Sequence, residues 1–260
     1  MRLVNGLTLL APPMTIAGVD PSRISRETLL GKVLRVPFKL LPKGAIVRVV
    51  RGPARGKRWI ADSSTHGFWL GYWELENQRL FAAHLRSGDV VYDVGAHVGL
   101  YTLVSSAQVG AQGHVYAFEP FPRNAQYLRR HIELNRLSNC TVVEAAVSNS
   151  SAWQRFDPTA HDTAGFLSTT GAVTVRSLTL DEFLSAAQER RPPNAIKINA
   201  EGAEMEILSG ARRILNEFSP LIFLSAHSHE LSCQCCELLC SVGYRIKYLS
   251  KGKIWADKST

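Results

Sequence analysis

The feature that most constrains the fold is an alternation of strand and helix patterns that begins near residue 88 and continues to the end of the chain. Apolar runs typical of buried strands lie at 89–95, 114–120, 140–147, 195–200 and 220–227. Helical patterns lie at 99–110, 122–137, 179–190, 203–218 and 230–243. This alternation predicts an α/β fold with a mostly parallel sheet that is covered by helices on both faces.

Other segments depart from this alternation. Two strand patterns, 244–250 and 253–257, follow the last helix and predict a terminal hairpin, which makes one late strand antiparallel at the sheet edge. Residues 45–62 predict a hairpin around a Gly-Pro turn, and a helical pattern begins near Glu74. Between the third strand and the helix that follows it, we expect a β-rich insertion over 152–176.

Basic residues are concentrated at the start of the chain. Residues 1–60 hold twelve of the 30 Lys and Arg but only two of the 22 acidic residues, which leaves eighteen basic against twenty acidic residues in the rest. We therefore divide the chain into a basic extension with its β-hairpin, residues 1–65, and a main domain, residues 66–260. Such a patch attracts phosphates, acidic glycans, nucleic acid or an anionic membrane surface, but it equally serves as a solvated face.

The remaining composition bears on location. No apolar run reaches the roughly 18 residues of a membrane-spanning helix, and the N-terminus lacks the pattern of a signal peptide. The five cysteines, four of them between 233 and 240, do not resemble a disulfide framework, so we expect a reducing cytoplasm. Cys233, Cys236 and Cys240 have the spacing of a buried helical stripe, which favours packing over a metal site.

The first strand runs into a glycine turn, Asp93-Val-Gly95-Ala96-His97-Val-Gly99. Glycines let a ligand lie close to the backbone, and the N-terminus of the following helix offers free N–H groups. In a dinucleotide-binding turn the second glycine contacts the pyrophosphate, but here His97 holds that position. A side chain is tolerable there when no pyrophosphate has to fit, as with S-adenosylmethionine, whose amino-acid end replaces the phosphates.

Three further strand ends carry suitable residues, because doubly wound sheets bind ligands at the carboxyl ends of their strands. Glu119, twenty residues after Gly99, is placed to accept both hydroxyls of an unphosphorylated ribose. Residues 145–147 offer a small apolar wall for an adenine face. Asn199 and Glu201 lie at or just past the fourth strand, where acidic residues also suit the following helix N-terminus.

Four stretches together resemble the FkbM-type S-adenosylmethionine-dependent methyltransferases: DVGAHVGLYT, VYAFEPFPRNAQYLRRHIELN, IKINAEGAEMEILSGA and SPLIFLSAH. The resemblance covers about residues 66–250. It implies a class I, Rossmann-like methyltransferase fold, a mostly parallel seven-stranded sheet that ends in an antiparallel hairpin, unlike plain dinucleotide-binding folds. It also implies methyl transfer to a small-molecule or glycan hydroxyl, commonly on a sugar, a polyketide or another secondary metabolite, with no nucleic acid expected.

The resemblance also implies roles for individual residues. Those that would hold the methionine end of the cofactor are Asp93, Gly95, Ala96, His97 and Gly99. Those that would contact the adenosyl part are Glu119 and Pro120 at the ribose and Ala146 at the adenine. Asn199 would lie beneath the sulfonium and the incoming acceptor.

The chain departs from the family pattern at two positions, each of which removes a carboxylate. The family usually has Asp where Asn199 stands, and it often has Glu where Ser225 stands. A hydroxyl acceptor needs its proton removed, and His227 at the end of the fifth strand is the best-placed general base. Glu201 is the second candidate and His97 the third.

Other functions stay open. The basic extension prompts an RNA methyltransferase, and the two lost carboxylates prompt a non-catalytic protein that binds S-adenosylmethionine. An NAD-dependent oxidoreductase is disfavoured by His97 and by the terminal hairpin. No residues are predicted as metal ligands.

Overall fold

The centre of the computed structural model, which describes residues 28, 41–158, 165–167, 170–250 and 252–258, is a seven-stranded sheet. From one edge to the other its strands are β12 (Arg245–Ser250), β13 (Lys253–Asp257), β11 (Leu221–Ser225), β10 (Ala195–Ile198), β3 (Val90–Val94), β4 (His114–Phe118) and β5 (Cys140–Val143). The neighbours from β11 to β5 are parallel, whereas β13 is antiparallel to both β11 and β12. The predicted fold class is confirmed, with one correction: the antiparallel strand lies inside the sheet, and β12 forms the edge.

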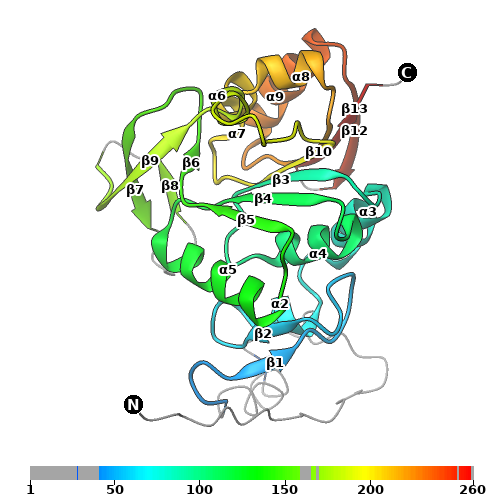
Figure 1. The fold of residues 1–260 in the computed structure, drawn as a ribbon. Helices are drawn as coiled ribbons and strands as arrows, with labels where there is room; N and C mark the ends of the chain where they lie inside the picture. The colour runs from blue at the N-terminus through cyan, green and yellow to red at the C-terminus, as the bar shows by residue number, and fades with distance from the viewer. Residues whose placement is uncertain (1–27, 29–40, 159–164, 168–169, 251, 259–260) are drawn as a thin grey trace.

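Helices cover both faces of this sheet, as predicted (Figure 1). One face carries α3 (Leu75–His84), α4 (Leu100–Val109) and α5 (Pro122–Leu134). The other carries α6 (Leu180–Ser185), α7 (Glu204–Ser209), α8 (Arg212–Glu217) and α9 (His229–Ser241). Because both faces are covered, side chains that point either way are buried, and all of β3 lies in the core. This double burial explains why the strands read as continuous apolar runs.

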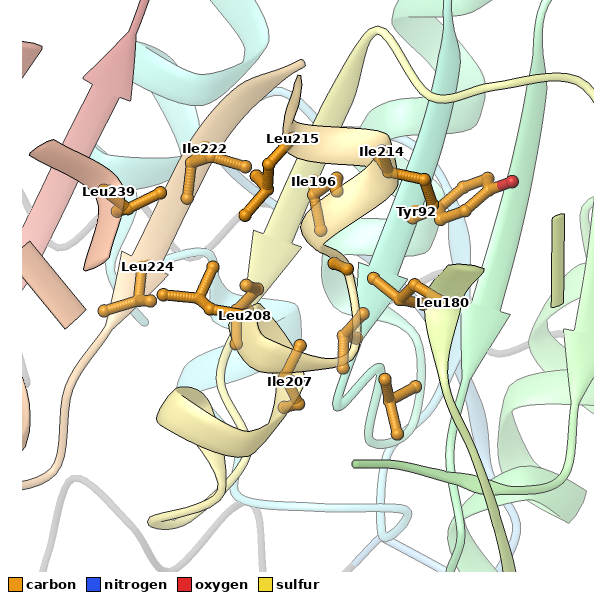
Figure 2. Close-up of a cluster of buried hydrophobic side chains, with 14 of the residues drawn as sticks. Tyr92, Leu180, Ile196, Ile207, Leu208, Ile214, Leu215, Ile222, Leu224 and Leu239 are labelled. Carbon is orange, nitrogen blue, oxygen red and sulfur yellow. The ribbon is translucent and has the colours of Figure 1, made fainter. Parts of the chain in front are cut away.

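The larger core cluster lies between the sheet and the second helical layer (Figure 2). Ile196 and Ile222 of neighbouring strands pack there with Ile207, Leu215 and Leu239 of the covering helices. Each side chain of this size contributes about 1.5–3 kcal/mol when it is fully buried. The cluster therefore fixes the strands β10 and β11, whose ends carry part of the candidate site.

The strand predicted at 140–147 is two strands in two different sheets. After β5 the chain leaves the main sheet, and β6 (Ala146–Val147) pairs in parallel with β9 (Val173–Leu178). A four-stranded sheet in the order β6-β9-β7-β8 results, with β7 (Trp153–Pro158) and β8 (Gly165–Leu167). It contains the predicted β-rich insertion, which is confirmed.

The helix predicted at 203–218 is interrupted near Gly210, so that α7 and α8 are separate. A Cβ on Gly210 would come within 2.2 Å of the Ser148 carbonyl oxygen, which shows how closely the two backbones approach. The carboxylate of Asp181 then accepts hydrogen bonds from the N–H groups of Arg213 and Ile214 and starts the new helix. Tertiary contacts therefore override a helical pattern that looks continuous in the sequence.

Two other helices differ from their predictions in detail. The helix predicted at 179–190 is only α6, and it begins at a side-chain cap, since Thr179 Oγ1 accepts a hydrogen bond from the Glu182 N–H at 3.0 Å. Of the predicted stripe, Cys236 is buried as expected, but Cys233 is only half-buried and Cys240 is exposed, and the buried face of α9 carries Cys235 instead. No group of three or more His, Cys, Asp or Glu among the described residues is arranged to hold a metal.

The predicted hairpin at 45–62 is present as β1 (Ile46–Arg48) and β2 (Arg58–Ile60), which pair antiparallel. It docks on α5, where the Ile60 N–H donates to His131 Nε2 at 3.0 Å and the Trp59 ring stacks on His131 at 4.1 Å. Trp59 also shares a core cluster with α3 and α4. The hairpin thus packs directly on the main domain, and a boundary at residue 65 stays a prediction.

Of the twelve basic residues before position 61, six lie in or next to the hairpin and six lie outside the described residues. Those outside are Arg2, Arg23, Arg26, Lys32, Arg35 and Lys39. None of the helices in the described part of the chain is both long and apolar enough to cross a membrane.

Candidate functional site

A cavity of about 260 Å³ lies over the carboxyl ends of β3, β4 and β10. Its wall combines the turn after β3, the end of β4, the link from β5 to β6 and the loop after β10. A short helix, α2 (Gly67–Leu70), and the segment that follows it add Phe68 and Trp73. The parallel sheet thus brings together strand ends that are far apart in the sequence, as expected for a doubly wound fold.

The turn after β3 depends on close backbone packing. Gly95 has φ +70°, and a Cβ there would come within 1.9 Å of the Asn199 carbonyl oxygen. Gly99 has φ +100°, and a Cβ there would come within 2.5 Å of Leu128 Cδ1 on α5. These glycines therefore let the turn lie against β10 and α5, whatever ligand the cavity holds.

The residues predicted to hold the methionine end fall into two groups. Gly95, Ala96 and His97 line the cavity, whereas Asp93 and Gly99 are not among the described residues of its wall. Asp93 is fully buried beneath the turn, where it accepts a hydrogen bond from Thr102 Oγ1 at 2.7 Å and lies 3.2 Å from Lys197 Nζ. Asp93 and Gly99 thus shape the turn, and a direct ligand contact for them stays a prediction.

Glu119 is buried at the end of β4 and lines the cavity, as the ribose prediction requires. Its Oε2 accepts the His97 N–H at 2.7 Å and its Oε1 accepts the Phe121 N–H at 3.0 Å. Burial raises the pKa of this carboxyl to about 7, although these hydrogen bonds oppose the shift. Glu119 therefore joins the two turns that flank the cavity.

The predicted adenine side of the cavity is small and apolar. Pro120 and Ala146 line it, together with Phe156 of β7. Phe156 is buried and stacks on Phe121 with 5.9 Å between ring centroids. The insertion therefore contributes directly to the wall, although no residue of it was predicted in the site.

Lys197 also lines the cavity, although it was not among the predicted site residues. Its Nζ donates to the Gly95 carbonyl at 2.9 Å and lies 3.2 Å from Asp93 Oδ1 and 5.2 Å from the centre of the Tyr101 ring. A lysine within an otherwise apolar buried strand was the available signal. It ties β10 to the turn after β3, and its charge is compensated by Asp93.

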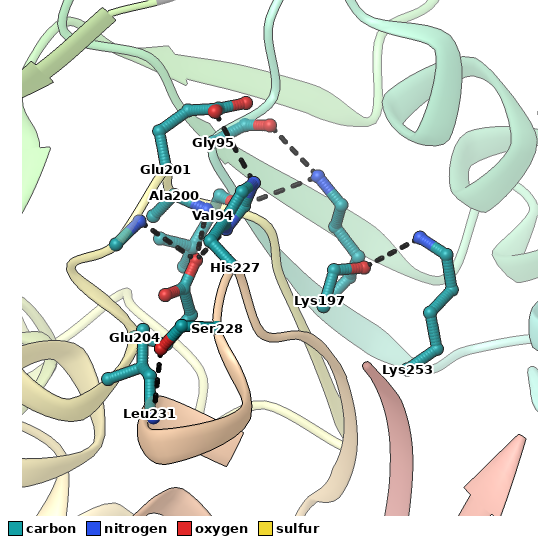
Figure 3. Close-up of polar contacts among 12 residues, drawn as sticks. Val94, Gly95, Lys197, Ala200, Glu201, Glu204, His227, Ser228, Leu231 and Lys253 are labelled. Atoms are coloured by element: carbon teal, nitrogen blue, oxygen red, sulfur yellow. Dashed lines mark hydrogen bonds and ion pairs between the residues drawn. The ribbon is translucent and has the colours of Figure 1, made fainter. Parts of the chain in front are cut away.

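Two of the predicted catalytic residues, Glu201 in the loop after β10 and His227 after β11, contact each other (Figure 3). Asn199 and Glu201 line the cavity, but His227 is not among the described residues of its wall. His227 Nδ1 lies 2.7 Å from Glu204 Oε1, and its Nε2 lies 3.3 Å from Glu201 Oε2. These two carboxylates raise the pKa of His227 to about 10.

These contacts argue against His227 as the general base. At neutral pH it is a cation with both ring nitrogens protonated, so it has no lone pair that can accept a proton. The same cation holds the pKa of Glu201 below its usual value, because it hydrogen-bonds the ionised carboxylate. The geometry therefore shifts the base candidate from His227 to Glu201.

Ser225 occupies the position where the family often has Glu, and Lys253 links it to the carboxylate of Glu74. Ser225 Oγ lies 2.9 Å from Lys253 Nζ of β13, and the same Nζ is paired with Glu74 at 2.5 Å. Tyr101, which lines the cavity, donates its hydroxyl hydrogen to Glu74 at 3.0 Å. Glu74 thus lies between the cavity wall and the C-terminal hairpin.

The strand order and the cavity define the class of protein. The seventh strand of the main sheet runs antiparallel between the fifth and the sixth, and the cavity lies over the first, second and fourth strands. That arrangement is the class I methyltransferase fold. The model of the methyltransferase FkbM domain matches residues 93–246, more than half of the chain, so the chain belongs to this family. The methyl donor of the family is S-adenosylmethionine.

Two relatives illustrate the range of similar proteins. Over 147 residues the chain is 27% identical to the hexuronic acid methyltransferase AglP of Haloferax volcanii. This match covers 55% of this chain and 59% of AglP. Over 82 residues it is 37% identical to the 31-O-demethyl-FK506 methyltransferase FkbM of Streptomyces tacrolimicus, covering 29% and 31%. The chain therefore spans less than two thirds of the curated relatives it matches.

Among solved structures, a methyltransferase FkbM from Methylobacillus flagellatus KT superimposes with a TM-score of 0.49 and 17% identity. The match covers 74% of this chain and 53% of that one.

The cavity residues fit S-adenosylmethionine. Two carboxylates, Glu119 and Glu201, line the wall, and the charge of Lys197 is compensated by Asp93, so the surroundings suit a ligand with cationic groups. The apolar side around Ala146 and Phe156 suits an aromatic base.

Proposed function

We propose that this protein is an O-methyltransferase that acts on a hydroxyl group of a sugar, a polyketide or another secondary metabolite. The observation that carries the proposal is a carboxylate on the cavity wall, Glu201, on the same wall as an exposed aromatic ring. Trp73 lines the cavity and remains 46% exposed, and it stacks on the buried Phe68 at 5.1 Å. A rigid half-exposed ring at a cavity is suited to the apolar face of an acceptor.

The chain's own residues divide the work. Gly95, Ala96 and His97 would hold the methionine end, Glu119 the ribose hydroxyls, and Pro120 and Ala146 the adenosyl group. Bound S-adenosylmethionine supplies a methyl group that its sulfonium already activates. Asn199, Trp73 and Glu201 would then orient the acceptor hydroxyl, and such positioning supplies up to about 7–11 kcal/mol in well-aligned reactions.

The relatives support the same direction. A hexuronic acid methyltransferase and a methyltransferase that acts on 31-O-demethyl-FK506 are a sugar-acid enzyme and a polyketide enzyme by their names. Glu201 also gives the cavity a carboxylate despite Asn199, which favours a catalytic protein over one that only binds the cofactor.

The test is a turnover assay with S-adenosylmethionine and a defined panel: methyl glucoside, methyl glucuronide and a hydroxylated macrolide, each with and without magnesium. We expect S-adenosylhomocysteine and a methylated product from at least one hydroxyl compound. Calorimetry with S-adenosylmethionine and with NAD provides the control. Binding of NAD but not of S-adenosylmethionine would overturn the proposal, as would tight cofactor binding with no product from any panel member.

A further inference from the structure

We propose that Glu201 accepts the proton of the acceptor hydroxyl and that Glu204 and His227 are positioning residues that hold it in place. The inference rests on the proposed O-methyl transfer and assigns its acid–base chemistry. The base is then the carboxylate of Glu201, which the His227 cation holds by a hydrogen bond, and not His227 itself. Three side chains carry the argument: Glu201 and Glu204 follow β10 in the chain, and His227 follows β11 (Figure 3).

Glu204 fixes the shape of the loop after β10. Its side chain is fully buried, and Oε1 accepts the N–H of Ala200 at 3.1 Å and the N–H of Gly202 at 3.3 Å. The same oxygen lies 2.7 Å from His227 Nδ1. One buried carboxylate therefore closes the loop on itself and also fixes the orientation of the imidazole.

His227 in turn fixes the orientation of the Glu201 side chain. With Nδ1 held by Glu204, Nε2 points at Glu201 Oε2 at 3.3 Å. Only a doubly protonated ring can donate to both carboxylates, and a charge-assisted hydrogen bond is about twice as strong as a neutral one. The imidazolium therefore keeps Glu201 ionised and limits the rotamers of its side chain.

The backbone at Glu201 adopts a left-handed conformation that is unusual for a residue with a side chain. Glu201 has φ +50° although it has a side chain, and Gly202 follows with φ +107°. A residue other than glycine in this region costs on the order of 1–3 kcal/mol, which surrounding contacts must offset. The contacts of Glu204 with this loop do so, and the Glu201 side chain, 41% exposed, is directed to the cavity wall.

Apart from His97, the third predicted base candidate, three other polar residues of the wall are less suited than Glu201 to accept a proton. Lys197 is engaged with Asp93 and the Gly95 carbonyl, and the Asn199 amide is not a base. Both oxygens of Glu119 accept backbone N–H groups. One carboxylate oxygen of Glu201 contacts His227. Among the contacts of the described residues, the other oxygen is left for the acceptor hydroxyl.

A carboxylate of low pKa suffices for this step. As the acceptor oxygen forms its bond to the methyl carbon, the carbon–sulfur bond breaks and its electron pair stays on sulfur. The O–H proton becomes strongly acidic as that bond forms, and it passes to Glu201, which leaves a neutral ether and a protonated carboxyl. The proton acceptor therefore has to be ionised and in place, and it does not need to be a strong base.

The experiment compares Glu201→Gln, His227→Gln and Glu206→Gln, with the hydroxyl compound that turns over fastest in the panel. Glu206 is the matched control, because it is an exposed glutamate in the first turn of the same helix, α7. We expect Glu201→Gln to lower kcat by about 10²–10⁴ with cofactor affinity kept within a few fold. Glu206→Gln should behave as the wild type. A kcat within a few fold of wild type for Glu201→Gln overturns the proposal.

His227→Gln separates positioning from a purely structural role. Without the cation, the pKa of Glu201 rises, so the acid limb of the kcat/KM profile should move to higher pH. A lower rate with an unmoved acid limb overturns the positioning role of His227.

A measurement without turnover keeps this inference distinct from the proposed function. Nitrogen NMR of the His227 ring should show both nitrogens protonated near pH 8 in the wild type, and the pKa should fall in Glu201→Gln. A neutral His227 ring near pH 8 would overturn the proposed charged contact of His227 with Glu201 and Glu204, whatever activity the protein has. A protonated ring in a protein that methylates no panel member overturns the proposed function and Glu201's catalytic role, and it leaves the contact itself standing.

Discussion

At the scale of single residues, Glu119 has the most distinct electrostatic role. Its carboxyl is buried, its pKa is raised to about 7, and it holds the N–H groups of His97 and Phe121. A ligand with cationic groups binds better when this carboxyl is ionised. We therefore expect S-adenosylmethionine to bind more tightly as the pH rises through about 7, as measured by calorimetry between about pH 6 and 8.

Substitution of Glu119 gives the control. Glu119→Gln should remove most of that pH dependence, and Glu119→Ala should abolish cofactor binding and leave the N–H groups of His97 and Phe121 without this acceptor. Glu144→Ala, which removes an exposed carboxylate paired with Arg129, should change neither property. Unchanged cofactor affinity in Glu119→Ala would remove the ribose assignment.

Gly95 supports a prediction based on packing alone. A Cβ at Gly95 would overlap the Asn199 carbonyl oxygen, so Gly95→Ala should push β10's loop away from the turn. We expect a loss of stability in urea unfolding of about 1–3 kcal/mol from overpacking, in addition to the roughly 1–2 kcal/mol for a left-handed alanine. Gly56→Ala is the comparison, because Gly56 has φ +84° with open space around it. Equal losses in the two variants would contradict the close approach.

At the scale of elements, the sequence predicted those helices and strands that are encoded by a local pattern of apolar and turn residues. The strands of the main sheet and the two hairpins follow from apolar runs and turn residues. The splits at 140–147 and 203–218 were missed, because they depend on β9 and on Ser148 and Asp181, which no local pattern reveals.

The site shows the same limit. Glycines, acids and strand ends identified Gly95, Glu119, Asn199 and Glu201 as residues of one cavity. The state of His227 was not predictable, because it depends on contacts with Glu201 and Glu204 more than twenty positions away. A histidine at a strand end looks the same in the sequence whether it is a free base or a paired cation.

The docking of the β1–β2 hairpin on α5 should depend on pH. His131 Nε2 accepts the Ile60 N–H, so its Nδ1–H donates to the Val98 carbonyl at 2.7 Å. Burial of this neutral ring lowers its pKa from 6.5 to about 4. A lowered histidine pKa means that the stabilisation is complete above about 6.5 and is lost as the pH falls toward 4.

The loss at about pH 4 should be on the order of 3 kcal/mol, and urea unfolding at several pH values measures it. His131→Gln, which cannot be protonated, should start less stable and lose less between about pH 6.5 and 4. Proton NMR supplies the second check. A His131 that titrates near 6.5 would rule out the buried neutral ring.

At the scale of the whole molecule, one ion pair connects the segment before the main domain's first strand to the last strand. Glu74 precedes α3 and Lys253 begins β13, and their side chains are only 22% and 13% exposed. Tyr101 and Ser225 hold the same two groups from α4 and β11. The pair thus keeps the chain around Trp73 against the sheet, and the cavity depends on it for part of its wall.

Lys253→Met should therefore loosen the segment 67–74 and leave Glu74 partly buried without its cation. Breaking a fully buried ion pair costs about 3–5 kcal/mol, and this pair is only partly buried, so we expect the free energy of unfolding to fall by less than that. Hydrogen exchange over 67–74 should be faster, and KM for the acceptor should rise. Glu74→Gln with Lys253→Met should recover part of the stability, since no unpaired charge remains. Arg245→Ala breaks the Arg245–Asp257 pair of the same hairpin, which is 69% and 44% exposed, and should cost at most about 1 kcal/mol. If Lys253→Met leaves exchange over 67–74 as in Arg245→Ala, the segment is held by its aromatic packing alone, and the ion pair has no part in forming the cavity.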